Sequence, residues 1–212
     1  MPVEPAHDCQ LCPRLAAFRA ENQQKFPEFW NAPVPSWGDR APRLVIVGLA
    51  PGLKGANRTG RPFTGDYAGD LLYATLLKFG LAEGEFLADP SDSLTLRAAQ
   101  IVNAVRCVPP ENKPTPAEIG TCRQFLSGAI EAARPRAYLA LGRIAHESLL
   151  TALGERKSAF PFGHGAEHAL SGGAVLFDSY HCSRYNTNTG VLTTAMFEDV
   201  VGRAAALVNR PS

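Results

Sequence analysis

The chain has 212 residues, and its 21 basic and 20 acidic side chains leave a formal net charge of +1. Hydrophobic residues make up 45% and charged residues 19% of the sequence, a balance typical of an ordinary globular protein and not of a disordered one. The near-neutral charge excludes a broadly basic coat, so a polyanion would have to bind at a local patch. We expect a single domain over residues 1–212.

Strands and helices are expected to alternate along the chain. Short apolar runs predict buried strands, and periodic apolar positions bounded by glycine or proline predict helices. In chain order we expect a helix at 15–29, a strand at 44–48, a helix at 68–79, a strand at 101–105, a helix at 116–133, a strand at 138–141, a helix after 142, a strand at 175–179 and a helix at 192–207. This alternation predicts an α/β fold, a three-layer α/β/α sandwich around a mainly parallel four-stranded sheet.

Two stretches between these elements are predicted to be surface loops, residues 86–96 and 160–173. The second contains His164 and His168, whose spacing would suit a zinc site on a helix, but flanking glycines argue against a helix there. No run approaches the roughly 20 apolar residues of a membrane helix, and the N-terminus lacks the apolar core of a signal peptide. We therefore expect a cytoplasmic protein with no membrane partner.

Four cysteines form a set that suits a metal centre. Cys9 and Cys12 make a C-x2-C pair that can place two thiolates on one metal. Cys107 and Cys122 can join them if Cys107 ends a strand and Cys122 lies on the next helix. In a cytoplasmic protein such a set favours metal over disulfides, and four thiolates suit either a [4Fe–4S] cluster or a tetrahedral zinc ion. Cys182 alone is equally well explained as a small buried hydrophobe.

The glycine-rich stretch 48–55 follows a predicted strand but is not a phosphate loop. Lys54 is followed by glycine instead of Ser or Thr, and a dinucleotide fingerprint is absent. Gly48 and the glycines after it would instead allow the backbone to approach a flat ligand, with Phe63 as a stacking platform; alternatively, Phe63 is simply core. Asp66 precedes a predicted helix, where it could cap the helix or act as a carboxylate that orients water.

Two further polar groups follow predicted strands. Asn103 ends a strand of apolar neighbours, and its amide could hydrogen-bond a base edge or be satisfied within the core. His181 opens the polar segment 181–190 after the last strand. Because ligands in parallel sheets bind beyond the carboxyl ends of the strands, we expect these groups to converge with the 48–69 loop.

Four motifs together resemble those of the family 5 (B-type) uracil-DNA glycosylases of bacteria and archaea. They are GLAPG at 48–52, GANRTGRPFTGD at 55–66, NAVRCVPPENKPTP at 103–116 and HCSRYNTNTG at 181–190. The cysteine arrangement is similar to that of the family 4 and 5 enzymes, which carry a [4Fe–4S] cluster. The similarity covers nearly the whole chain, and it implies an α/β/α monofunctional enzyme that excises uracil from DNA and leaves an abasic site.

The resemblance also implies roles for individual residues. Ala50 stands where other glycosylase families have a polar water-activating residue, and Asp66 would take over that role. Phe63 would stack on the flipped base, Asn103 would hydrogen-bond its Watson–Crick edge, and His181 would stabilise negative charge on the departing base. Because Ala50 is small and apolar, we expect tolerance of other deaminated bases, namely hypoxanthine and xanthine.

The remaining implied contacts are with DNA and the cluster. Arg184 or Tyr185 would fill the gap left by the flipped base. Arg58 and Arg61 would contact phosphates, with surface salt bridges as the alternative. The cluster ligands would be Cys9, Cys12, Cys107 and Cys122.

The chain departs from the family pattern at one position, Cys182, where related enzymes often have proline. Proline would restrict the backbone of the loop beside His181, and cysteine does not. A second function from another class is a non-catalytic, metal-stapled protein that binds damaged DNA. For either function we expect a monomer.

Overall fold

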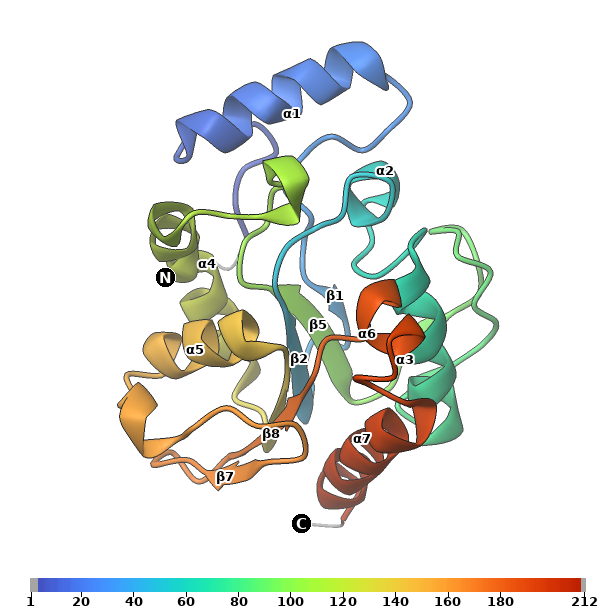
Figure 1. Cartoon of the computed structure of the whole chain (residues 1–212), viewed down its shortest axis with the longest axis vertical. Coiled ribbons are helices and arrows are strands. Elements are labelled where there is room, and N and C mark those ends of the chain that lie inside the picture. The colour runs from blue at the N-terminus through green and yellow to red at the C-terminus, as the bar shows by residue number, and fades with distance from the viewer. Residues whose placement is uncertain (1–3, 211–212) are drawn as a thin grey trace.

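Four parallel strands form the centre of the molecule in the computed structural model, which describes residues 4–210 (Figure 1). They are β2 (Leu44–Gly48), β5 (Ala99–Asn103), β6 (Ala137–Leu141) and β8 (Val175–Ser179). Short antiparallel strands, β1 (Trp37–Gly38) and β7 (Glu167–Ala169), flank them, so that the order is β1-β5-β2-β6-β8-β7. The parallel centre confirms the predicted sheet, and the two edges extend it from four strands to six.

Helices cover both faces of this sheet and complete the predicted three layers. One face carries α4 (Pro116–Ala133) and α5 (Arg143–Ala152), and the other carries α3 (Tyr67–Lys78) and α7 (Thr194–Val208) (Figure 1). Within β2, Val45 and Val47 pack toward α4 and α5, whereas Leu44 and Ile46 pack toward α3 and α7. This alternation is the period of a strand whose two faces are both buried.

Helix α1 (Pro13–Lys25) lies at one end of the molecule, near the start of α4 (Figure 1). Arg14 donates from two nitrogens to the Glu118 carboxylate at 2.8 and 2.7 Å, and Leu15 packs with Val105 and Phe125. Glu118 also completes a capping box with Thr115 at the start of α4. The N-terminal segment is therefore tied to the loop and helix that follow β5.

The remaining elements are short. They are α2 (Ala56–Thr59), β3 (Ala82–Glu83), β4 (Thr95–Leu96), η1 (Pro110–Asn112), η2 (Lys157–Ala159) and α6 (Arg184–Asn188). Within the described part of the chain, no helix has both the length and the hydrophobicity needed to span a membrane.

Several predicted boundaries were wrong. The helix predicted at 15–29 is α1, which ends four residues earlier at Lys25, because Pro27 disfavours helical backbone at the residue before it. The elements predicted at 68–79, 138–141 and 192–207 are shifted by one or two residues. Strand β5 begins and ends two residues earlier than predicted, because Ala99 and Gln100 pair with β2 while Val105 turns into the loop. The stretch 86–96, predicted to be loop, ends in β4, and 160–173 contains β7. These strands of two and three residues are set by pairing with a neighbour, and so short a strand leaves no periodic signal in the sequence.

Candidate functional site

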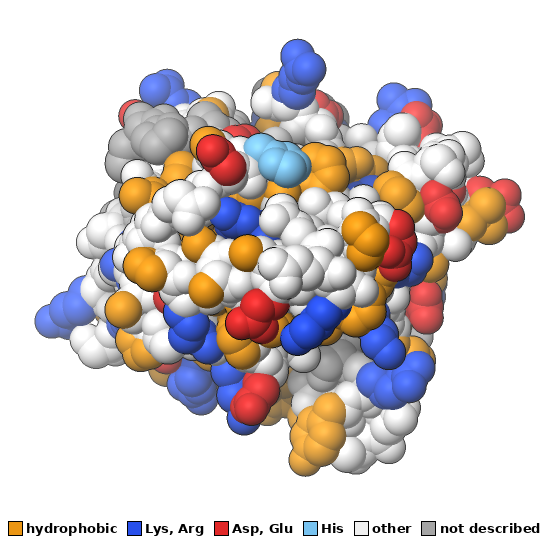
Figure 2. All heavy atoms as spheres, turned by 90° about the horizontal axis from the view of Figure 1, so that it is seen from above, with side chains coloured by type: hydrophobic (Ala, Val, Ile, Leu, Met, Phe, Trp, Pro, Cys, Tyr) orange, Lys and Arg blue, Asp and Glu red, His pale blue; other side chains and the backbone are white. Residues whose placement is uncertain are grey.

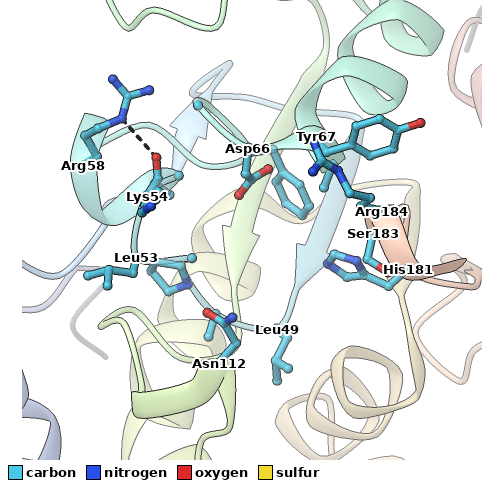
Figure 3. Close-up of a pocket in the computed structure, with 18 of the residues that line it drawn as sticks. Leu49, Leu53, Lys54, Arg58, Asp66, Tyr67, Asn112, His181, Ser183 and Arg184 are labelled. Carbon is cyan, nitrogen blue, oxygen red and sulfur yellow. Dashed lines mark hydrogen bonds between the residues drawn. The ribbon is translucent and has the colours of Figure 1, made fainter. Parts of the chain in front are cut away.

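A cavity of about 950 Å³ lies where the loops after β2, β5 and β8 meet (Figure 3). The parallel register places Gly48 beside Asn103, so the first two loops start side by side. Most of the predicted site residues line this cavity, and Figure 3 shows Asp66 and His181 entering it from different elements. The lining residues among them are Ala50, Arg58, Phe63, Asp66, Asn103, His181 and Arg184.

Among the residues predicted to contact the base or the DNA, Gly48, Tyr185 and Arg61 do not line the cavity. Gly48 lies in the wall behind it: a methyl group added there would overlap Asn103 Oδ1 and lie 2.9 Å from Phe63 Cζ. Glycine at this position therefore lets both side chains pack onto the end of β2. Tyr185 is 74% exposed at the start of α6, outside the cavity.

The Asn103 side chain is nearly closed off from solvent, with 4% of its surface exposed. Its Oδ1 has no hydrogen-bond partner among the described residues. Leaving a buried acceptor unpaired costs about 1–3 kcal/mol, so this oxygen is suited to accept a hydrogen bond from a ligand. A core asparagine whose hydrogen bonds were all satisfied internally would not have this unpaired oxygen, so the structure does not support that alternative.

Phe63 combines a core position with an unusual backbone. Its φ is +51°, a left-handed conformation that is rare for a bulky side chain and costs on the order of 1 kcal/mol or more. A methyl group on Gly69 would overlap the Phe63 carbonyl, so the chain is packed tightly here. The ring packs in the α3/α7 core and faces His181, with 5.9 Å between ring centroids and 29° between planes. Phe63 is thus both core and cavity wall.

Asp66 occupies the N-cap position of α3 without capping it. Its side chain accepts no capping hydrogen bond, and Oδ1 is buried without a partner among the described residues. Burial raises the pKa of the carboxyl group, and the nearby N–H groups of Gly69 and Ala68 only partly offset that effect. The other oxygen packs over Gly55, where an added methyl group would overlap it. The carboxylate is therefore confined at the cavity wall with an unused acceptor.

His181 stands at the opposite wall from the glycine-rich loop (Figure 3). Burial lowers its pKa to about 4, which keeps the imidazole neutral at neutral pH. The side chain of Asn186 donates to the His181 carbonyl at 2.8 Å, and Cys182, the residue that replaces proline, is fully buried in the core. These contacts fix the loop that proline would otherwise restrict.

The rim of the cavity carries three exposed cations, Lys54, Arg58 and Arg184. The Arg184 guanidinium lies 5.2 Å from the centroid of the Tyr67 ring, and Arg58 donates to the Lys54 carbonyl at 3.0 Å (Figure 3). Basic and acidic side chains are interspersed on the face seen from above α1 (Figure 2). Cationic character near the cavity is therefore local, as the net charge predicts.

Arg61 is not available at this rim. It is only 4% exposed and donates from two nitrogens to the Asp92 carboxylate, at 2.7 Å each. Its guanidinium also lies 5.0 Å from the centroid of the Trp37 ring. The predicted phosphate contact by Arg61 is wrong, and the salt-bridge alternative holds, although the bridge is buried instead of on the surface.

The four cysteines of the predicted metal set line one small second cavity, between the N-terminal segment, the loop after β5 and α4. Burial raises the pKa of the Cys107 thiol to about 11 and that of Cys122 to about 12. Arg19 donates to Cys107 Sγ at 3.4 Å, and the backbone N–H of Arg106 donates to Cys122 Sγ at 3.3 Å. Both sulfurs thus sit among donors that stabilise a metal-bound thiolate.

Among the lining residues that sequence analysis gave no individual role, two are notable for their geometry. Asn112, with φ of +58°, and Gly55 both face it, the first from η1 and the second from the turn before α2. Asparagine in a proline-rich turn is a known signal for this backbone conformation, but nothing local links Asn112 to a cavity. Gly55 matters only because Asp66 folds back over it.

Comparison with known proteins places this geometry in a family. The profile of the uracil DNA glycosylase superfamily matches residues 35–204. A type-5 uracil-DNA glycosylase of Thermus thermophilus is 48% identical over 206 residues, covering 94% of this chain and 93% of the relative. The type-5 enzymes of Pyrobaculum aerophilum and Mycobacterium tuberculosis are 39% and 42% identical; each alignment covers 94% of this chain, and 88% and 78% of the relative.

Proposed function

Because this chain belongs to the type-5 group of the uracil-DNA glycosylase superfamily, we propose that it is a DNA repair glycosylase that flips uracil out of DNA and hydrolyses its glycosidic bond. The observation that carries the proposal is the convergence of Phe63, Asp66, Asn103 and His181 on one cavity. A cavity of about 950 Å³ has room for an extruded nucleotide.

Base recognition rests on Phe63 and Asn103. Extruding a base costs a few kcal/mol, and stacking on an aromatic ring returns about 1–3 kcal/mol. The unpaired Asn103 Oδ1 can accept the ring N–H of uracil while the amide nitrogen donates to the adjacent carbonyl. Both interactions require a base that has left the duplex, because its Watson–Crick edge is otherwise paired.

Bond cleavage rests on Asp66 and His181. As the glycosidic bond breaks, positive charge develops on the sugar and negative charge on the base. The Asp66 carboxylate stabilises the first and orients the water whose oxygen bonds to the sugar carbon. His181, as a neutral imidazole, donates a hydrogen bond to an oxygen of the departing base. The base leaves with its bonding electrons and takes up a proton, and an abasic site remains.

The small side chain of Ala50 in the wall of the base cavity supports a substrate range wider than uracil alone. Ala50 is small, lines the cavity and has no polar group to reject a larger base. We expect hypoxanthine and xanthine to be excised as well. Release of free base from duplexes carrying uracil, hypoxanthine, xanthine or no lesion tests the function directly. A non-catalytic damage-binding protein would bind the uracil duplex without releasing base, and that result would refute the enzyme.

At the rim, we propose that Arg58 contacts a DNA phosphate and that Arg184 or Tyr185 fills the gap left by the flipped base. Tyr185, exposed beside Arg184, is suited to occupy the gap left by the flipped base. An aromatic ring at that point can stack between the neighbouring bases, which offsets part of the cost of unstacking.

The second cavity supports a [4Fe–4S] cluster held by Cys9, Cys12, Cys107 and Cys122. A single zinc ion would require sulfur atoms about 3.8 Å apart, from Zn–S bonds of about 2.3 Å. Among the described residues, the one set of three donors within 4.8 Å of one another contains no cysteine. Sulfur atoms spaced more widely than a single zinc ion requires suit a [4Fe–4S] cluster instead. When bound, it would join the N-terminal segment to the loop after β5 and to α4.

The rate of excision should depend on pH through Asp66. Burial raises the pKa of this carboxyl above the ordinary value of about 3.9, so acidification protonates it and removes the water-orienting carboxylate. We expect a level single-turnover rate near neutral pH that falls on the acid side, with its inflection above the ordinary value. No inflection is expected near pH 6.5, because the pKa of His181 is lowered to about 4. A rate that stayed level down to the ordinary aspartate pKa would contradict this assignment.

Gly55→Ala should slow excision without unfolding the protein. The new methyl group would overlap the Asp66 carboxylate, and displacement of a catalytic group by about 1 Å can cost on the order of 100-fold in rate. Gly120→Ala is the matched control, since a methyl group at that position on α4 meets nothing within 4 Å. Equal single-turnover rates for the two variants would show that the packing of Asp66 over Gly55 is unimportant.

A further inference from the structure

Three metal-binding side chains meet in a second buried cluster that the proposed function does not use. His146 comes from α5, His168 from β7 and Asp178 from β8. His146 Nδ1 lies 2.7 Å from Asp178 Oδ1, and His168 Nε2 lies 3.2 Å from Asp178 Oδ2. Asp178 is 0% exposed and His146 1%. None of the three lines the base cavity or the cysteine cavity.

The hydrogen bonds of His146 define what its Nδ1 can do. His146 Nε2 lies 2.9 Å from the Phe160 carbonyl, which can only accept, so Nε2 carries a hydrogen. In a neutral imidazole Nδ1 is then a bare lone pair, and it points at a carboxylate oxygen. That contact needs either a proton on one of the two atoms or a metal ion that both atoms bind. For tetrahedral zinc, with bonds of about 2.0–2.1 Å, the two atoms would move apart from 2.7 Å to about 3.3 Å as the ion enters.

The surroundings favour a metal ion. Two imidazoles and one carboxylate form a donor set that zinc and related divalent ions bind. A histidine that ligates a metal usually donates its other N–H to a carbonyl or carboxylate, as His146 does to Phe160. The Phe162 ring lies 5.5 Å from His146 and the Phe160 ring 5.8 Å from His168, between centroids. Such an apolar shell strengthens the attraction between an ion and its ligands.

We propose that His146, His168 and Asp178 bind one divalent transition-metal ion, with zinc as the preferred occupant. Three protein donors leave the fourth tetrahedral position for water or an added ligand. The ion would join three elements, and it would fasten the three-residue edge strand β7 to the sheet. It would also fix the end of β8, three residues before His181. The proposal does not depend on glycosylase activity.

Metal uptake by the intact protein, with its iron retained, tests the site. After treatment with a chelator, the wild type should take up about one equivalent of Co²⁺ with visible bands of a four- or five-coordinate ion, and Zn²⁺ should displace it. His168→Ala and Asp178→Asn should bind at least ~10-fold more weakly. His164→Ala is the matched control on the same segment: His164 Nδ1 accepts from the Tyr180 N–H at 3.1 Å and takes no part in the cluster.

Two results would overturn the proposal. One is the absence of saturable Co²⁺ or Zn²⁺ uptake by the wild type, which needs no variant and so does not depend on whether a variant folds. The other is equal affinity in the wild type and His168→Ala. Either result would leave the three side chains as a hydrogen-bonded network only. Constant iron absorbance during the titration excludes zinc that has entered the cysteine cavity.

Discussion

Asp66→Asn is expected to slow single-turnover excision of uracil by a factor of at least ~100, the scale of a lost acid–base group. The asparagine side chain keeps the shape of the carboxylate and its N-cap preference, but it carries no negative charge to stabilise the sugar cation and cannot orient the water as a base. The measurement is release of free uracil from a labelled duplex with enzyme in excess, at a pH where the wild-type rate is level.

The same substitution should not destabilise the protein, which separates a catalytic role from a structural one. The pKa of Asp66 is raised in the folded state, so the ionised carboxylate is disfavoured by folding. That cost is absent below the ordinary aspartate pKa and grows to its full value as pH rises above the folded-state pKa. At neutral pH the uncharged asparagine avoids it, and we expect a melting temperature equal to or above that of the wild type.

Asp70→Asn is the matched control for charge. Asp70 is exposed in the first turn of the same helix, so its substitution removes one negative charge near the same place. The rate should stay close to that of the wild type. If Asp66→Asn excised uracil at a near-normal rate, or if Asp70→Asn were equally slow, the carboxylate of Asp66 would not be the group that promotes cleavage.

The fold could be predicted from the sequence where elements are long or fully buried. Helix α4, bounded by Pro116 and Ala133, and strand β8, from Val175 to Ser179, have the predicted limits. The helix has a capping box and a proline as local signals, and the strand begins with the apolar run Val175–Phe177. Edge strand β7 has no such signal. It forms because its backbone pairs with β8, which is information held in the partner strand.

The candidate site likewise has a part that could be predicted from the sequence and a part that could not. Polar residues directly after strands were predictable, because a parallel sheet brings strand ends together, and Asn103 and His181 do line one cavity. Contacts between distant side chains were not. Nothing near Arg61 or Asp92 indicates their buried ion pair, and nothing near His146 predicts its contact with Asp178, which lies 32 residues later. Such pairs depend on tertiary packing, for which a single sequence gives no spacing rule.

Cys107→Ala is expected to have the second large effect, on stability and iron content. Losing one of four thiolates should release the cluster, and the free energy of metal binding is also free energy of folding. We expect a colourless or weakly coloured protein with little iron per chain. A loss of about 3 kcal/mol or more would lower the melting temperature by roughly 10 °C in a chain of this length. Iron analysis, visible absorbance and thermal unfolding together test the prediction.

Cys182→Ala is the control that separates ligation from packing. Cys182 is also buried, in the α3/α7 core, so the substitution removes the same atoms without touching the cysteine cavity. Its cost should be that of a small cavity, about 1 kcal/mol, with iron content unchanged. Equal iron content in the two variants would exclude Cys107 as a ligand. The Arg14–Glu118 ion pair would then be the main polar contact that holds α1 against α4, and a surface-accessible pair contributes little by itself. We therefore expect loss of the metal centre to loosen the N-terminal segment, which would keep only this pair and the packing of Leu15 against Val105 and Phe125.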